Sequence, residues 1–246
     1  MKAFLAGLLL CFLALPAMAA PTFPALTGRV VDDAHILSDA TKSDLTEKLA
    51  ALEAKTSRQL VVVTLPSLGG YEISDYGYQL GRAWGIGQGK LNNGAILIVA
   101  PTEHRVRIEV GYGLEPILTD AFSSVVITTQ ITPQFKKGDF NAGVSAGVDA
   151  LIEQLSLETS VAEQKAATAA SQVQHRGQDS GGGPSGFIVL LIILFVIFRV
   201  FGGWGFLPFL FMGGGGGGGG FGGGSGGGGF SGGGGSFGGG GSSGSW

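Results

Sequence analysis

The sequence has little of the chemistry that enzymes use for covalent catalysis. It contains one cysteine and three histidines in 246 residues. The cysteine, Cys11, lies in an apolar N-terminal stretch that we predict to be removed. The remaining chain would then have no disulfide, thiolate metal site or cysteine nucleophile. The histidines, His35, His104 and His175, accompany no Gly-x-Ser-x-Gly motif, which disfavours a serine–histidine–acid triad.

Charge is also sparse. Only 13% of the residues are charged, and 18 acidic residues against 15 basic ones give a formal net charge of −3. Lys136–Lys137 is the only basic doublet of the domain. A nucleic-acid surface needs clustered basic residues, so we expect no nucleic-acid partner. The sequence also lacks the Gly-Lys-Ser/Thr of a phosphate-binding loop, and no organic cofactor is predicted.

What is present begins with an export signal. Lys2 precedes the apolar run Ala3–Leu15, and small residues follow at Ala17 and Ala19. This order is typical of a secretory signal peptide. We therefore predict a signal peptide over residues 1–19.

A second apolar run lies near the other end of the chain. Phe187–Phe198 is uninterrupted, and the run continues past Arg199. Since a membrane span needs about 20 residues, we predict one transmembrane helix over residues 186–204, with residues 158–185 as its tether. Arg199 favours a cytoplasmic end. The expected location is the bacterial plasma (inner) membrane, crossed by a single span. The folded domain would be extracytoplasmic (periplasmic) and the tail cytoplasmic.

The tail is dominated by glycine, which accounts for 47 residues of the chain. Such a composition builds no core, so residues 205–246 are predicted to be disordered. Phe221, Phe230, Phe237 and Trp246 are isolated aromatic residues within it. An inert tail and a weakly self-associating tail both agree with this pattern.

The folded domain is predicted over residues 27–157. Residues 59–65 and 95–100 are continuously apolar, which is typical of buried strands, and residues 105–110 alternate like a half-covered hairpin partner. Helical patterns cover residues 39–56, 74–84, 120–130 and 141–157. Strands that are covered on both faces predict an α/β fold, a three-layer α/β/α sandwich with a small mixed sheet.

Five oxygen-bearing side chains follow or precede the predicted strands. Asp32 and Asp33 follow a short apolar run, Asn93 precedes the second strand, and Glu115 and Asp120 follow the third. If these loops meet at one edge of the sheet, they form an all-oxygen site suited to Ca²⁺, and less well to Mg²⁺. Equally, the acids could cap turns and helices. The sequence leaves both open.

Three further residues are candidate contacts for an anion or a partner. Arg105 and Arg107 share one face of the third strand, where a solvated or salt-bridged stripe is the alternative. Tyr112 lies between two glycines, so an exposed aromatic contact is one interpretation and a packed tyrosine is the alternative.

The stretch from Asn92 to Asp120 also resembles a known family. Asn92-Asn93-Gly94 precedes an apolar run, and R-V-R-I-E-V-G-Y-G-L-E and T-D-A follow. This is similar to the signature of the TPM-domain family, in its bacterial membrane-anchored (YgcG-type) branch, whose members often end in S-G-S-W as this chain does. The resemblance implies a three-layer fold. The matching positions are Asp32 or Asp33, Asn93-Gly94, Gly111, Gly113, Glu115 and Asp120.

For the family's function, the resemblance implies two possibilities. Acid phosphatase activity and Ca²⁺ binding are described in the family, although many relatives have aspartate where this chain has Asn92. One expectation is a binding or accessory module that acts on envelope or membrane proteins. The other is a metal-assisted phosphomonoesterase, whose metal polarises a phosphoryl oxygen and activates water. The lack of a nucleophile and base favours the module.

Overall fold

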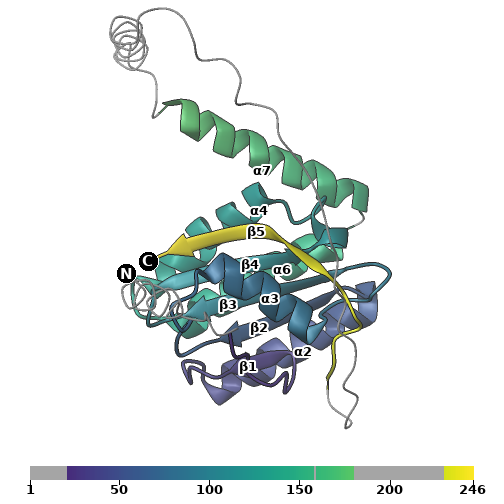
Figure 1. Ribbon diagram of the computed structural model, residues 1–246. Helices are drawn as coiled ribbons and strands as arrows, with labels where there is room; N and C mark the ends of the chain where they lie inside the picture. The colour runs from purple at the N-terminus through teal and green to yellow at the C-terminus, as the bar shows by residue number, and fades with distance from the viewer. Residues whose placement is uncertain (1–20, 158, 180–229) are drawn as a thin grey trace, which may run out of the picture.

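The computed structural model describes residues 21–157, 159–179 and 230–246 (Figure 1). The predicted signal peptide, residues 1–19, and the predicted span, residues 186–204, lie outside the described residues. Within the described ranges, no helix has the length and apolar character needed to cross a membrane.

The centre of the molecule is a five-stranded mixed sheet, in the order β1-β2-β3-β4-β5. The first three strands are parallel, β4 is antiparallel to β3, and β5 is antiparallel to β4. Every residue of β2 and β3 is buried, which explains why their sequences are continuously apolar. The strands are β1 (Val30–Asp32), β2 (Gln59–Thr64), β3 (Gly94–Ala100), β4 (Arg105–Gly111) and β5 (Phe237–Ser245).

Alternate residues of the central strands belong to two separate apolar cores, one on each face of the sheet. Leu97 and Val99 belong to the core that also contains α2 and α6 residues. Ile96 and Ile98 belong to the core that contains α3 residues. This arrangement confirms the α/β class and the mixed sheet, with helices on both faces (Figure 1).

The helices divide between the two cores. The first core is lined by α2 (Asp39–Thr56), α4 (Asp120–Val126), α5 (Thr132–Phe135) and α6 (Phe140–Ser156), with the π-helical turn η2 (Ile127–Ile131). The second core lies under α3 (Ile73–Trp84). A 3-10 turn, η1 (Tyr112–Leu114), follows β4, and α7 (Thr159–Asp179) follows α6.

The predicted tether, residues 158–185, contains the helix α7 over residues 159–179. Ala162, Ala166 and Ala169 of α7 are buried, and Gln154 Nε2 on α6 donates to the Ala162 carbonyl at 2.8 Å. A stripe of alanines is apolar but narrow, so composition alone suggests a linker where the helix packs closely.

The prediction of a disordered tail is wrong for its C-terminal part. Residues 237–245 form β5 along the free edge of β4, shown in yellow in Figure 1. A strand that pairs with β4 must share the compartment of the domain. The predicted span, residues 186–204, is outside the described residues, so the predicted single span with a cytoplasmic tail stays a prediction.

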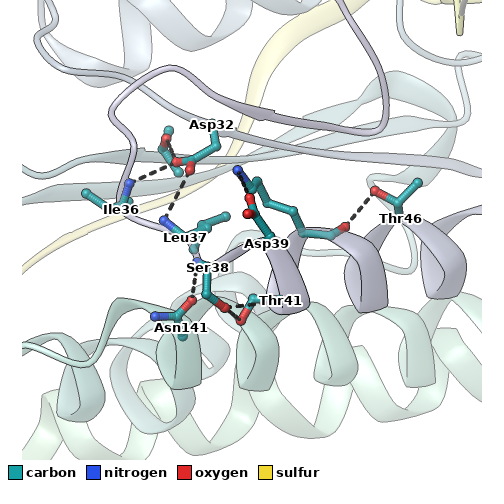
Figure 2. Close-up of polar contacts among 10 residues, drawn as sticks. Asp32, Ile36, Leu37, Ser38, Asp39, Thr41, Thr46 and Asn141 are labelled. Carbon is teal, nitrogen blue, oxygen red and sulfur yellow. Dashed lines mark hydrogen bonds and ion pairs between the residues drawn. The ribbon is translucent and has the colours of Figure 1, made fainter.

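The loop after β1 is closed by Asp32 (Figure 2). Its Oδ1 accepts the N–H of Ile36 and its Oδ2 that of Leu37, both at 3.1 Å. The hydroxyl of Thr64 donates to Oδ1 at 2.6 Å. The chain then enters α2, where Ser38 Oγ caps the helix by accepting the N–H of Thr41. Asp32 therefore acts as a structural cap.

Replacing Asp32 with alanine should destabilise the fold. The substitution leaves two partly buried N–H groups without an acceptor, so we expect a loss of about 1–3 kcal/mol in the free energy of unfolding. Asp33 is exposed and is the matched control: Asp33→Ala should change stability by less than about 0.5 kcal/mol. Urea unfolding measures both. Equal effects of the two substitutions would contradict the structural role of Asp32.

Candidate functional site

The candidate site is the groove along the edge of β4, in which β5 lies. The strands pair from Arg105 opposite Ser245 to Gly111 opposite Phe237, with a register shift between Val110 and Gly111. The groove walls are α3 on one face of the sheet and α4 with η2 on the other. In this structure the ligand of the groove is thus an extended segment of the chain itself.

Phe237 anchors the first end of β5. Its side chain is fully buried in the core under α3. A Cβ on Gly81 of α3 would lie 2.7 Å from Phe237 Cδ2, so only glycine leaves room for the ring at that position. Arg82, the next residue of α3, donates from Nε to the Phe237 carbonyl at 2.7 Å.

Trp246 anchors the other end, against the opposite core. Its ring lies 4.6 Å from Phe135 and 6.0 Å from Phe140, measured between centroids. It also lies 5.6 Å from His104, whose carbonyl accepts the Trp246 N–H. Phe237 and Trp246 therefore pack against opposite faces of the sheet, and these two contacts fix the position and the direction of the strand between them.

A buried ion pair links β4 to the tail. Arg107 Nε donates to Glu109 Oε2 at 2.5 Å, and the two residues are 4% and 0% exposed. The other guanidinium nitrogens bind β5: Nη1 donates to Ser243 Oγ at 2.9 Å and Nη2 to the Gly239 carbonyl at 2.7 Å. The predicted partner contact of Arg107 is thus filled by the tail.

Burial raises the pKa of Glu109 to about 7, because a carboxylate loses its hydration between β4, α3 and β5. The nearby Arg107 guanidinium and the backbone N–H of Gly239 oppose that rise. Glu109 Oε1 is buried and has no hydrogen-bond partner among the described residues. A proton on this carboxyl near neutral pH relieves the cost of a buried charge.

Gly241 is the position of β5 at which the groove requires glycine. It has φ +113°, a conformation that L residues rarely adopt, and a Cβ there would overlap the Ile108 carbonyl. A Cβ on Gly238 would meet the Tyr112 ring, and one on Gly240 would lie 2.9 Å from Glu115 Oε1, so a larger residue at either place would have to move those side chains.

Polar side chains of the flanking loops bind the backbone of the tail. Asp120 Oδ1 accepts the Gly241 N–H at 2.7 Å, and Asn92 Oδ1 accepts the Ser236 N–H at 2.9 Å. Glu115 and Tyr112 line the same path. Arg105 is exposed and lies opposite Ser245 at the end of the pairing.

The predicted metal residues do not converge. Asp32 and Asp33 lie at the C-terminal end of the parallel strands, whereas Asn93 lies before the N-terminal end of β3. A seven-residue strand places these ends about 20 Å apart. Asn93 instead holds a loop, donating to the Ser57 carbonyl at 2.7 Å and accepting the Gln88 N–H at 2.8 Å.

Of the five, Glu115 and Asp120 both face the tail, whereas Asp32 and Asp33 lie together at the other end of the sheet. Over the described ranges, no group of three or more His, Cys, Asp or Glu side chains could hold a metal ion. The five residues therefore do not fit a single Ca²⁺ site. Arg107, Tyr112, Glu115 and Asp120 are brought together for another purpose, which is contact with the tail.

Sequence reasoning missed Gly81, Phe237 and the Phe135–Phe140 pair that contacts Trp246. The sequence did contain an indication of the role of Gly81. Gly77 and Gly81 are one helical turn apart on α3 and leave a hollow facing β4. The aromatic residues at both ends of the last glycine run were a second signal.

Comparisons with known proteins agree with this fold. A protein-family model described as TPM domain matches residues 30–154. The chain is similar to the N-terminal domain of a P. gingivalis protein, known from solution NMR, with 38% identity and a TM-score of 0.50. That likeness covers 52% of this chain and 82% of that one. No curated protein matches the sequence.

Two further solution NMR structures are more distant. The N-terminal domain of a Corynebacterium glutamicum protein is 19% identical, with a TM-score of 0.43, covering 58% of this chain and 89% of that one. A protein from Bizionia argentinensis is 22% identical, also with a TM-score of 0.43, covering 48% and 81%.

Stability should fall as the pH rises toward neutrality. The pKa of Glu109 is about 7 in the folded protein against an ordinary value of 4.5, so the folded state binds more protons between these values. The stabilising contribution is complete below about pH 4.5 and is lost as the pH rises through about 7. Unfolding measured from pH 4 to 8 tests this.

The matched variants are Glu109→Gln and Glu47→Gln. The first should flatten the pH dependence between pH 4.5 and 7, because an amide does not titrate. The second changes an exposed glutamate on α2 and should leave the slope as it is. A slope that survives in Glu109→Gln would show that another group causes it.

Proposed function

The chain belongs to the TPM-domain family, and from this premise we propose that it is an exported, membrane-tethered binding module of the bacterial envelope. Its work is to hold extended, glycine-rich segments of envelope or membrane proteins along the edge of β4. The membrane-anchored, YgcG-type branch is the part of the family to which we assign it. Residues 1–19 supply the export signal, and residues 186–204 attach the chain to the membrane from the side of the domain, because the tail beyond them pairs with β4.

The observation that carries this proposal is the seating of β5. Strand addition at an exposed sheet edge is a general mode of peptide recognition, in which backbone hydrogen bonds give affinity and side-chain pockets give specificity. Both parts are present here. The edge of β4 supplies the backbone pairing, and the sites of Phe237 and Trp246 supply two aromatic pockets.

The positions of the charged residues favour binding over phosphoryl transfer. A metal-assisted phosphatase needs acids that hold the metal beside a cation that holds the phosphate. Here the acids are divided between the two ends of the sheet. Arg107 donates instead to Glu109 and to the tail. No step of the proposed function depends on Ca²⁺.

A chain that ends at residue 229 should bind a synthetic peptide of residues 230–246. We expect saturable binding, and a loss of affinity of about 10- to 100-fold in a peptide with Phe237→Ala. This follows from about 1.5–3 kcal/mol for burying the ring, at about 1.4 kcal/mol for each factor of ten. Calorimetric titration measures the affinity, after thermal unfolding has verified that the shortened chain is folded.

Two further peptides test the specificity of the groove. Trp246→Ala should weaken binding to a similar degree, because it empties the pocket of Phe135 and Phe140. Ser245→Ala is the control, since Ser245 is exposed. A folded chain that binds none of the peptides, or binds all of them equally, would refute the proposed function.

A further inference from the structure

One short segment, residues 230–246, makes all the contacts with the groove that are described above. Phe230 lies against Arg29, whose guanidinium carbon is 4.5 Å from the ring centroid, and the contacts end at Trp246. Residues 180–229 join this segment to α7 and are rich in glycine. A chain spans up to about 3.3–3.6 Å per residue, so a link of this length is long enough for the tail to reach a second domain.

When the tail leaves its own domain, another strand has to pair with β4 in its place. The edge of β4 would otherwise present unpaired N–H and C=O groups, which is unfavourable and promotes association. The replacement must carry two aromatic anchors at the spacing of Phe237 and Trp246, with small residues between them. The requirement is strictest at Gly241, where a Cβ would overlap a backbone carbonyl.

The segment that meets every requirement is the tail of a second copy of this chain. Resting on the proposed function, we propose that β5 exchanges between copies, so that the tail of one chain completes the sheet of another. The contacts are the same in both arrangements. Their balance is therefore set by the concentration of the copies relative to the effective concentration of the tail at its own domain, and a high density of copies favours the exchange.

Cysteine pairing across β4 and β5 distinguishes exchange from self-docking. Arg105 and Ser245 are opposite each other and exposed, and Cys11 is the only natural cysteine. In a Cys11→Ser background, full-length Arg105→Cys and Ser245→Cys chains carry different tags and are co-expressed. Neither chain can form an internal disulfide. We expect mild oxidation to yield a dimer that carries both tags.

Two variants control for random collision. Lys55→Cys is exposed on α2, at the other side of the sheet, and should give at least tenfold less dimer with Ser245→Cys. Adding Trp246→Ala to the Ser245→Cys chain should reduce the mixed dimer by about tenfold, since it removes an anchor. Equal dimer yields in all three pairings would overturn the exchange.

The double variant Arg105→Cys/Ser245→Cys separates the two proposals. If it closes within one chain while the co-expressed pair gives no dimer, the tail docks only on its own domain. The exchange is then wrong and the binding groove stands. If the double variant does not close either, the groove itself is wrong and the proposed function falls with it.

Discussion

The open edge of β4 is the constraint on which the rest of the structure depends. A long apolar strand at the edge of a sheet promotes association unless it is paired or covered, and here β4 is paired with a segment that lies far away in the sequence. The need to pair this edge explains features on both sides of the groove. Glycine on α3 leaves room for Phe237, and glycine on β5 lets its backbone approach Ile108, Tyr112 and Glu115.

The buried pair of Arg107 and Glu109 shows that the edge is built for specificity as well as stability. Taking two charges out of water is costly, and their attraction repays the cost only when further hydrogen bonds complete the arrangement. Those bonds come from Ser243 and Gly239 of the tail. A segment without polar groups at these places would leave the guanidinium unsatisfied. The pair therefore discriminates among strands that could otherwise pair with β4.

The sequence predicted the inner sheet well because β2 and β3 are buried on both faces and read as continuous apolar runs. It failed for β5 because glycine composition measures the cost of ordering a free chain and ignores a template that supplies the hydrogen bonds. The five predicted metal residues do not meet at one edge of the sheet, for a topological reason. Asp32 ends strand β1 and Asn93 precedes strand β3, so in parallel strands they lie at opposite ends. The spacing of Gly77 and Gly81 was the missed indication of a groove.

The sequence distance between β4 and β5 has a consequence for the folding of the protein during its synthesis. The last pairing of the sheet joins residues 105–111 to residues 237–245. At a synthesis rate of about 5–20 residues per second, β5 appears roughly 6–26 s after its partner strand. Once α6 has been made, the nascent chain carries most of its hydrophobic core beside a bare edge until β5 follows. An unpaired strand edge promotes association, so the protein is most exposed to aggregation in that last part of its synthesis.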